Sequence, residues 1–165
     1  MNNEQTHTIS IFVVNKPGVL MRVAQVFSRR GFNIDSLVVS SGFDDKYARM
    51  TISAKTCGGD LIQIKRQLNK LVDVMHCIEH EGTDSIVKEL ALIKVACTSE
   101  ERTSLLQITE HFACKTVGMT KNTMIIEATG NSDKIDAMLI LLEDFKIIEL
   151  VRTGKVLMAR GGEDT

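Results

Sequence analysis

The sequence has no tryptophan, one tyrosine and one proline among 165 residues, and it lacks a long apolar run. No segment approaches the ~20 apolar residues that a transmembrane helix needs. Residues 1–8 are polar and lack the apolar core of a secretory signal, so we expect a cytoplasmic protein with no membrane-bound part. The 44% of hydrophobic residues exclude a disordered chain, and the single proline with 11 glycines excludes a collagen-like one.

An excess of charge of either sign is also absent, since 20 Lys and Arg residues stand against 21 Asp and Glu residues. The basic pairs Arg29-Arg30 and Lys65-Arg66 are isolated from each other in the sequence. This pattern disfavours nucleic acid and anionic membranes as partners.

Motifs for catalysis and for metal binding are missing. The sequence contains no phosphate-binding glycine loop, no Gly-x-Ser-x-Gly and no His-Glu-x-x-His. The four cysteines, at positions 57, 77, 97 and 114, form no Cys-x-x-Cys motif, which fits reduced, buried thiols. His76 and His80 would lie roughly 13 Å apart on a strand, too far to share one ion. We therefore predict neither catalytic residues nor a metal site.

Hydrophobic periodicity divides the chain into two similar halves. The first half predicts strands over residues 7–14, 33–41, 47–54 and 72–80, and helices over 19–30 and 61–71. The second half predicts strands over 89–97, 114–119, 123–129 and 146–151, and helices that begin near Thr98 and near Asn131. Gly31 stands where a left-handed residue is expected after the first helix, and Asp60 can cap the helix over 61–71. Thr98 with Glu101 forms a capping box, and Asn131 or Ser132 can cap the last helix.

Both halves therefore have the order βαββαβ. The predicted class is α+β, with two tandem ferredoxin-like units over residues 1–80 and 86–160, a polar linker at 81–85 and a loose tail at 161–165. Each unit would have an open sheet face and exposed edges. Side-by-side pairing of two copies would cover them, so we expect a homodimer.

The segment 15–22, Asn-Lys-Pro-Gly-Val-Leu-Met-Arg, joins the first strand to the first helix. Gly18 allows close approach to the backbone, and the helix start presents free amides to an anion. Asn15 adds a donor and an acceptor, so the loop suits the carboxylate and ammonium of a small amino acid. A tight turn with proline at the helix entry explains the same residues equally well. Gly18 with Arg22 also resembles the phosphate loop of acylphosphatases, although Ser40 stands where that family needs Asn, so an enzyme of that type is a remote alternative.

Ordered strings across both halves resemble the small regulatory subunit of acetolactate (acetohydroxyacid) synthase. In the first half they are Asn-x-Pro-Gly-Val-Leu-x-Arg-Val at 15–23, Phe-Ser-x-Arg-Gly-Phe-Asn-Ile-x-Ser-Leu at 27–37, Arg-Met-Thr-Ile at 49–52 and Leu-Val-Asp-Val at 71–74. Val-Lys-Glu-Leu at 87–90, Arg-Thr-Gly at 152–154 and Ala-Arg-Gly at 159–161 continue the resemblance. It covers about residues 6 to 161.

The resemblance implies that residues 1–80 form an ACT domain, an amino-acid-sensing module, and that the chain has no active site of its own. Such a subunit binds the large catalytic subunit, activates it, and mediates feedback inhibition by valine or another branched-chain amino acid. Thiamine diphosphate, magnesium and, where it is used, FAD belong to the catalytic subunit. Carried over by motif, the effector contacts are Asn15, Gly18, Val19 and Leu20 of one chain with Asn33 and Ile34 of its partner.

The same sequence pattern is also similar to that of a second class of protein. A free-standing tandem ACT protein that regulates transcription in response to an amino acid would share the fold and the loop. Weak agreement with the strings at 49–52 and 71–74 would favour that alternative, and here both strings are intact.

Overall fold

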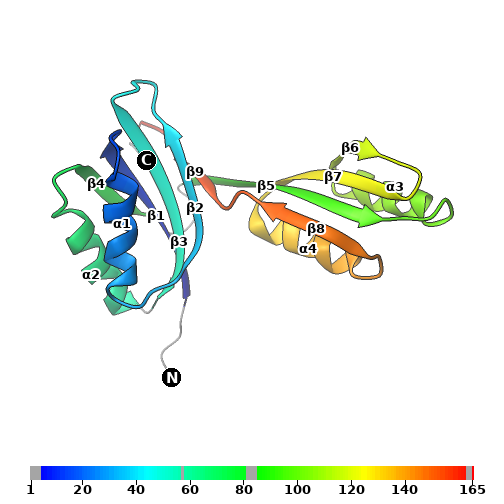
Figure 1. Ribbon diagram of the computed structural model, residues 1–165, viewed down its shortest axis with the longest axis horizontal. Helices are drawn as coiled ribbons and strands as arrows, with labels where there is room; N and C mark the ends of the chain where they lie inside the picture. Colours follow the sequence, from blue (N-terminus) through cyan, green and yellow to red (C-terminus); the bar gives the residue numbers. More distant parts are fainter. Residues whose placement is uncertain (1–4, 57, 81–84, 163–164) are drawn as a thin grey trace. The chain divides into compact units, whose positions relative to one another are not determined.

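The protein is described from a computed structural model, which covers residues 5–56, 58–80, 85–162 and 165. It divides into two compact units (Figure 1). The first unit comprises Met1–Ile86 and Gly154–Thr165, and the second comprises Val87–Thr153. Each contains four antiparallel strands and two helices in the order βαββαβ, which confirms the predicted α+β class with two ferredoxin-like units.

The first unit has its four strands in the order β2-β3-β1-β4, so β2 and β4 are the edges. Its elements are β1 (Gln5–Val14), α1 (Val19–Ser28), β2 (Ile34–Ser41), β3 (Tyr47–Thr56), α2 (Gly58–Leu68) and β4 (Val74–Glu79). Alternate residues of β1 and β3, including Ile9, Ile11 and Ile52, are fully buried beneath the two helices. This core fixes which face of the sheet the helices cover.

Helix α1 forms where the periodicity predicts it, because Val19, Val23 and Phe27 share one buried face. It ends at Ser28, two residues earlier than expected, and Gly31 follows with φ of +74° as the predicted left-handed residue. Helix α2 begins at Gly58 rather than at residue 61. Asp60 therefore lies in its first turn and does not cap it, which corrects that part of the prediction.

The second unit has its strands in the order β6-β7-β5-β8. Its elements are β5 (Ser85–Ala96, which begins in the first unit), α3 (Glu101–His111), β6 (Lys115–Met119), β7 (Thr123–Gly130), α4 (Ser132–Leu142) and β8 (Ile147–Arg152). The capping box is confirmed, since the Thr98 amide donates to Glu101 Oε2 at 2.8 Å and the Glu101 amide donates to Thr98 Oγ1 at 3.3 Å. Asn131 caps α4 by accepting from the Lys134 amide.

The C-terminal segment, residues 154–165, is the main departure from the sequence-based picture. We expected residues up to 160 in the second domain, but 154–165 cluster with the first unit. The segment contains an unexpected strand, β9 (Val156–Ala159), which pairs with β5. Gly154, with φ of +85°, lies so close to Ser36 that a Cβ would stand 2.6 Å from the Ser36 Cβ. Only glycine fits there, because both the dihedral angle and the space exclude a side chain.

The described residues of this segment lie against the sheet face that points away from α1 and α2, where Gly154 meets Ser36. Ser10, Thr51 and Ser53 occupy that face by strand alternation, and all three are buried. At the far end of the segment, the Thr165 carbonyl lies 3.4 Å from His76 Nε2. The open face predicted for the first sheet is thus covered in part by residues of the same chain.

The corresponding face of the second sheet stays exposed. It carries Leu92, Ile125 and Val151 around an ion pair in which Lys94 Nζ and Glu149 Oε2 are 2.8 Å apart. This hydrogen bond lowers the pKa of the Glu149 carboxyl. None of the described helices is long and apolar enough to cross a membrane.

Candidate functional site

The loop between β1 and α1 has the backbone geometry of an anion-binding helix start. Gly18 is the N-cap residue of α1, with φ of +84° and ψ of −10°, and no side chain caps the helix. The Val19 amide reaches only Lys16 O, at 3.4 Å. Within the described parts of the chain, the amides of Gly18, Leu20 and Met21 have no acceptor. The first turn holds no acidic residue, so the positive end of the helix dipole is unneutralised.

Arg22 adds a full positive charge beside these amides. Its Nη1 lies 3.9 Å from the position that a Cβ on Gly18 would take, and its Nη2 donates to Asp73 Oδ2 at 2.5 Å. The sequence analysis assigned Arg22 no part in amino-acid binding. Its position could have indicated one, because a residue four positions after the N-cap lies on the same helix face as the N-cap residue, Gly18.

The side chains of the predicted contacts differ in accessibility. Asn15 is exposed and donates from Nδ2 to the Asp45 carbonyl at 2.9 Å, which leaves its Oδ1 as an acceptor. Leu20 is 42% exposed, whereas Val19 is 2% exposed and packs in the core. Of the two apolar residues, only Leu20 therefore presents its side chain at the surface of this loop.

Asn33 and Ile34 lie at the opposite end of the same sheet. Ile34 pairs with Ala54, which pairs with His7 at the start of β1, whereas Asn15 directly follows the end of β1. Eight residue steps separate His7 from Asn15, about 26 Å at ~3.3 Å per residue. Within one chain the structure brings Asn15, Gly18, Val19 and Leu20 together and keeps Asn33 and Ile34 apart from them.

The histidines and the buried thiol of the first unit have structural partners. His76 stacks on Phe12 with 5.3 Å between ring centroids, and His80 Nε2 lies 3.0 Å from Ser10 Oγ. Burial, with a smaller contribution from Arg49, lowers the pKa of His80. Burial also raises the pKa of the Cys77 thiol to about 12, which keeps it protonated and unreactive. Cys57 lies outside the described residues.

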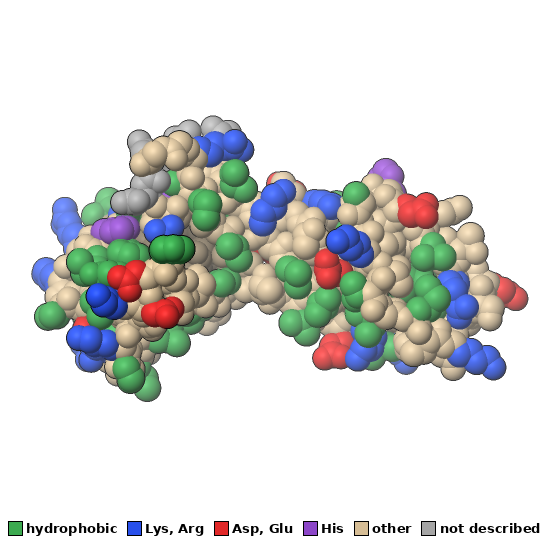
Figure 2. Space-filling view, turned by 90° about the horizontal axis from the view of Figure 1, so that it is seen from above, with side chains coloured by type: hydrophobic (Ala, Val, Ile, Leu, Met, Phe, Trp, Pro, Cys, Tyr) green, Lys and Arg blue, Asp and Glu red, His purple; other side chains and the backbone are tan. Residues whose placement is uncertain are grey.

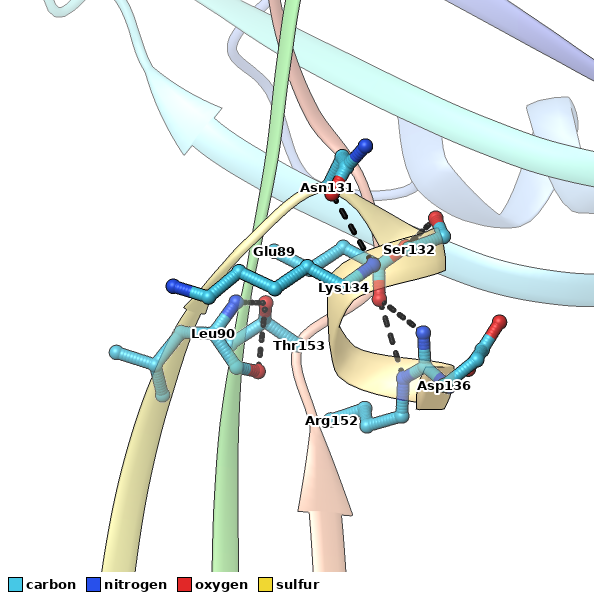
Figure 3. Close-up of polar contacts among 8 residues, drawn as sticks. All are labelled: Glu89, Leu90, Asn131, Ser132, Lys134, Asp136, Arg152 and Thr153. Atoms are coloured by element: carbon cyan, nitrogen blue, oxygen red, sulfur yellow. Dashed lines mark hydrogen bonds and ion pairs between the residues drawn. The ribbon is translucent and has the colours of Figure 1, made fainter. Parts of the chain in front are cut away.

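A polar cluster in the second unit was missed by the sequence interpretation (Figure 3). The buried Glu89 carboxylate accepts from Arg152 Nε at 3.1 Å, from Arg152 Nη2 at 2.6 Å and from the Ser132 hydroxyl. Arg152 Nη1 also donates to Asp136 Oδ1 at 2.5 Å. Burial alone would lower the pKa of Arg152, but the bonds to Glu89 and Asp136 outweigh it and raise the pKa. The cluster joins β5, α4 and β8, and its hydrogen bonds hold these elements together.

Two family models match the chain, one in each half. The model of the AHAS small subunit-like ACT domain matches residues 9–76, and the model described as the small subunit of acetolactate synthase matches residues 88–161.

Relatives of known name agree with these models over nearly the full length. An acetolactate synthase small subunit of Mycolicibacterium smegmatis is 42% identical over 160 residues, which cover 97% of this chain and 94% of the relative. A probable acetolactate synthase small subunit of Methanothermobacter thermautotrophicus is 45% identical over 157 residues and 94% of each chain. The crystal structure of the acetolactate synthase small subunit from Thermotoga maritima superposes with a TM-score of 0.86 at 35% identity, covering 96% of this chain and 99% of that one. The chain therefore belongs to the acetolactate synthase small-subunit family, and its residues 9–76 form the ACT domain of that family.

Proposed function

We propose that this chain is a non-catalytic regulatory subunit that binds the catalytic subunit of acetolactate synthase, activates it, and transmits feedback inhibition by valine. Family membership supports a regulatory role in branched-chain amino acid biosynthesis. The observation that carries the finer proposal is the arrangement of the predicted contacts in two clusters at opposite ends of one sheet.

The cluster around Gly18 has the chemistry for the charged part of an amino acid. The free amides of Gly18, Leu20 and Met21, with Arg22 beside them, suit the carboxylate. The Asn15 Oδ1 can accept from the ammonium group. The exposed side chain of Leu20 offers an apolar contact for a branched side chain.

A second copy would complete the site. Strand β2 is an edge of the sheet, so β2 of a second copy can pair with it in antiparallel orientation. Pairing about the midpoint of β2 places Ile34 of the second copy level with Ser41, which pairs through Ala48 with Val13 at the end of β1. Asn33 and Ile34 of the second copy then lie at the same end of the joined sheet as Asn15. This register supports a homodimer with the effector between its subunits.

The catalytic chemistry would belong to the partner. In this proposal thiamine diphosphate, magnesium and any FAD are held by the large subunit in the cytoplasm, and this chain contributes regulation alone.

Reconstitution tests the proposal. The purified chain is mixed with the catalytic subunit of the same organism, and acetolactate is measured with and without valine, leucine or isoleucine. We expect no acetolactate from this chain alone, a faster reaction from the mixture, and slowing of that reaction by valine. Acetolactate formation by the isolated chain, or a mixture no faster than the catalytic subunit by itself, would refute the proposal.

A further inference from the structure

A groove on the helix side of the first unit brings the basic pair Arg29-Arg30 beside α2. Arg29 and Arg30 follow the end of α1, and together with Val26 and Gln67 they line a groove of about 460 Å³ between α1 and α2. Arg30 Nη1 spans the helices and donates to Gln63 Oε1 at 2.5 Å. At the left end of Figure 2, several Lys and Arg side chains of the first unit lie among Asp, Glu and hydrophobic side chains.

Most of this positive charge is not neutralised within the unit. Arg22 pairs with Asp73, and Lys65 pairs with Glu79 at 3.2 Å. Four further cations have no acidic partner among the described residues: Arg29 and Arg30, which line the groove, and Arg66 and Lys70, which follow Gln63 and Gln67 by three positions each. We call these four the basic groove residues. The one acidic side chain in α2 is Asp60, in its first turn. The groove is therefore a locally positive surface on a chain whose net charge is −1.

The chemistry of the groove fits carboxylates of a protein better than a nucleic acid. Val26 gives the groove an apolar wall, and Ile62, 52% exposed, adds apolar surface on α2. Neither helix exposes an aromatic ring on which a base could stack, since Phe27 is buried.

We propose that this groove docks an acidic segment of the catalytic subunit. The guanidinium groups of Arg29 and Arg30 would pair with Asp or Glu side chains, and Val26 would contact an apolar residue between them. The inference rests on the proposed function, because it needs the catalytic subunit as partner. Beyond that function, the inference names the surface of this chain that contacts the catalytic subunit, and it assigns positive charge to this surface and negative charge to its partner.

Binding measurements with the purified catalytic subunit test this directly. The dissociation constant is measured by calorimetry for the full chain, for R29E/R30E, and for R66E/K70E. The matched control is K115E/K121E, which makes the same change in charge on exposed lysines of the second unit that have no ion pair in the described structure. Circular dichroism and thermal melting confirm the fold of each variant. All measurements are made at about 0.01 M and 0.1 M salt, where the screening length is ~30 and ~10 Å.

We expect R29E/R30E to weaken binding at least about tenfold and R66E/K70E to weaken it in the same direction, because like charges then face each other. The control should bind within about twofold of the unchanged chain, whose own affinity should fall with salt. Unchanged affinity of a folded R29E/R30E variant would overturn the inference while leaving the proposed function intact. Failure of the unchanged chain to bind would overturn the proposed function as well. Binding of a duplex oligonucleotide as tight as that of the catalytic subunit, lost in R29E/R30E, would assign the groove to nucleic acid instead.

Discussion

Replacing Gly18 by aspartate tests the proposed effector site at its centre. The substitution puts a carboxylate at the N-cap of α1, where the free amides and Arg22 would otherwise meet the carboxylate of valine. Space is not the obstacle, since the nearest atom to an added Cβ is Arg22 Nη1 at 3.9 Å. The new side chain can accept from the amides as a capping aspartate does, and it can draw Arg22 away from Asp73.

The expected cost is moderate for the fold and large for the ligand. With φ of +84°, a residue other than glycine is strained by about 1 kcal/mol, and N-capping by aspartate offsets part of this. The exchange of one exposed ion pair for another contributes less than about 1 kcal/mol. Loss of the hydrogen bonds to the valine carboxylate costs about 1.5–3 kcal/mol, which corresponds to a roughly ten- to hundredfold weaker affinity.

Calorimetry measures the affinity for valine, and assays of the reconstituted enzyme measure its inhibition by valine. Gly18→Asp should stay folded, should still activate the catalytic subunit, and should need about ten to a hundred times more valine for inhibition. Asn15→Ala should shift the response in the same direction. The matched control is Gly161→Asp, because Gly161 has φ of +77° and open space around it, so strain and charge are the same away from the loop. A folded Gly18→Asp variant with full sensitivity to valine would place the effector elsewhere.

Three further substitutions test contacts within the two units. Arg152→Leu should lower the free energy of unfolding by about 3 kcal/mol, because it leaves the buried Glu89 carboxylate without its cation. Lys94→Leu, which breaks an exposed ion pair, should lower it by less than about 1 kcal/mol. Equal urea midpoints for the two variants would contradict this prediction. The His80 ring has a pKa below its ordinary value of 6.5, so the unfolded chain binds this proton more readily, and stability should be full above about pH 6.5 and fall as the pH drops below it. His80→Gln should flatten this fall, and an unchanged pH dependence of the melting temperature would refute the assignment to His80.

The helices and strands were predictable because their signals are local. Burial of Val19, Val23 and Phe27 follows from helical spacing, and the capping box at Thr98 follows from residues three positions apart. The start of α2 was misplaced because Asp60 resembles an N-cap, while the helix begins two residues before it. Element type is thus determined more firmly than element ends.

The candidate site was only partly accessible from the sequence. The properties of the loop at Gly18 are local, since a glycine directly before a helix has no side chain to cap it, and the first amides of the helix stay unpaired whatever the rest of the fold is. The distance between Asn15 and Asn33 depends instead on the register of β1, β2 and β3, which no local pattern reports. That register is what makes a second copy necessary for a site containing both residues. The position of Val19 in the core is likewise a consequence of packing.

The sequence by itself determined the repeated βαββαβ order, the caps and the exposed loop, because periodicity and capping act between residues at most a few positions apart. The tertiary structure alone decided the rest. Glu89 meets Arg152 across 63 positions, Gly154 packs against Ser36, and Arg30 reaches Gln63 on the neighbouring helix. These contacts depend on which strands pair and on how α1 lies beside α2. Such pairings are set by the burial of the whole core, and the sequence around one partner does not identify the other.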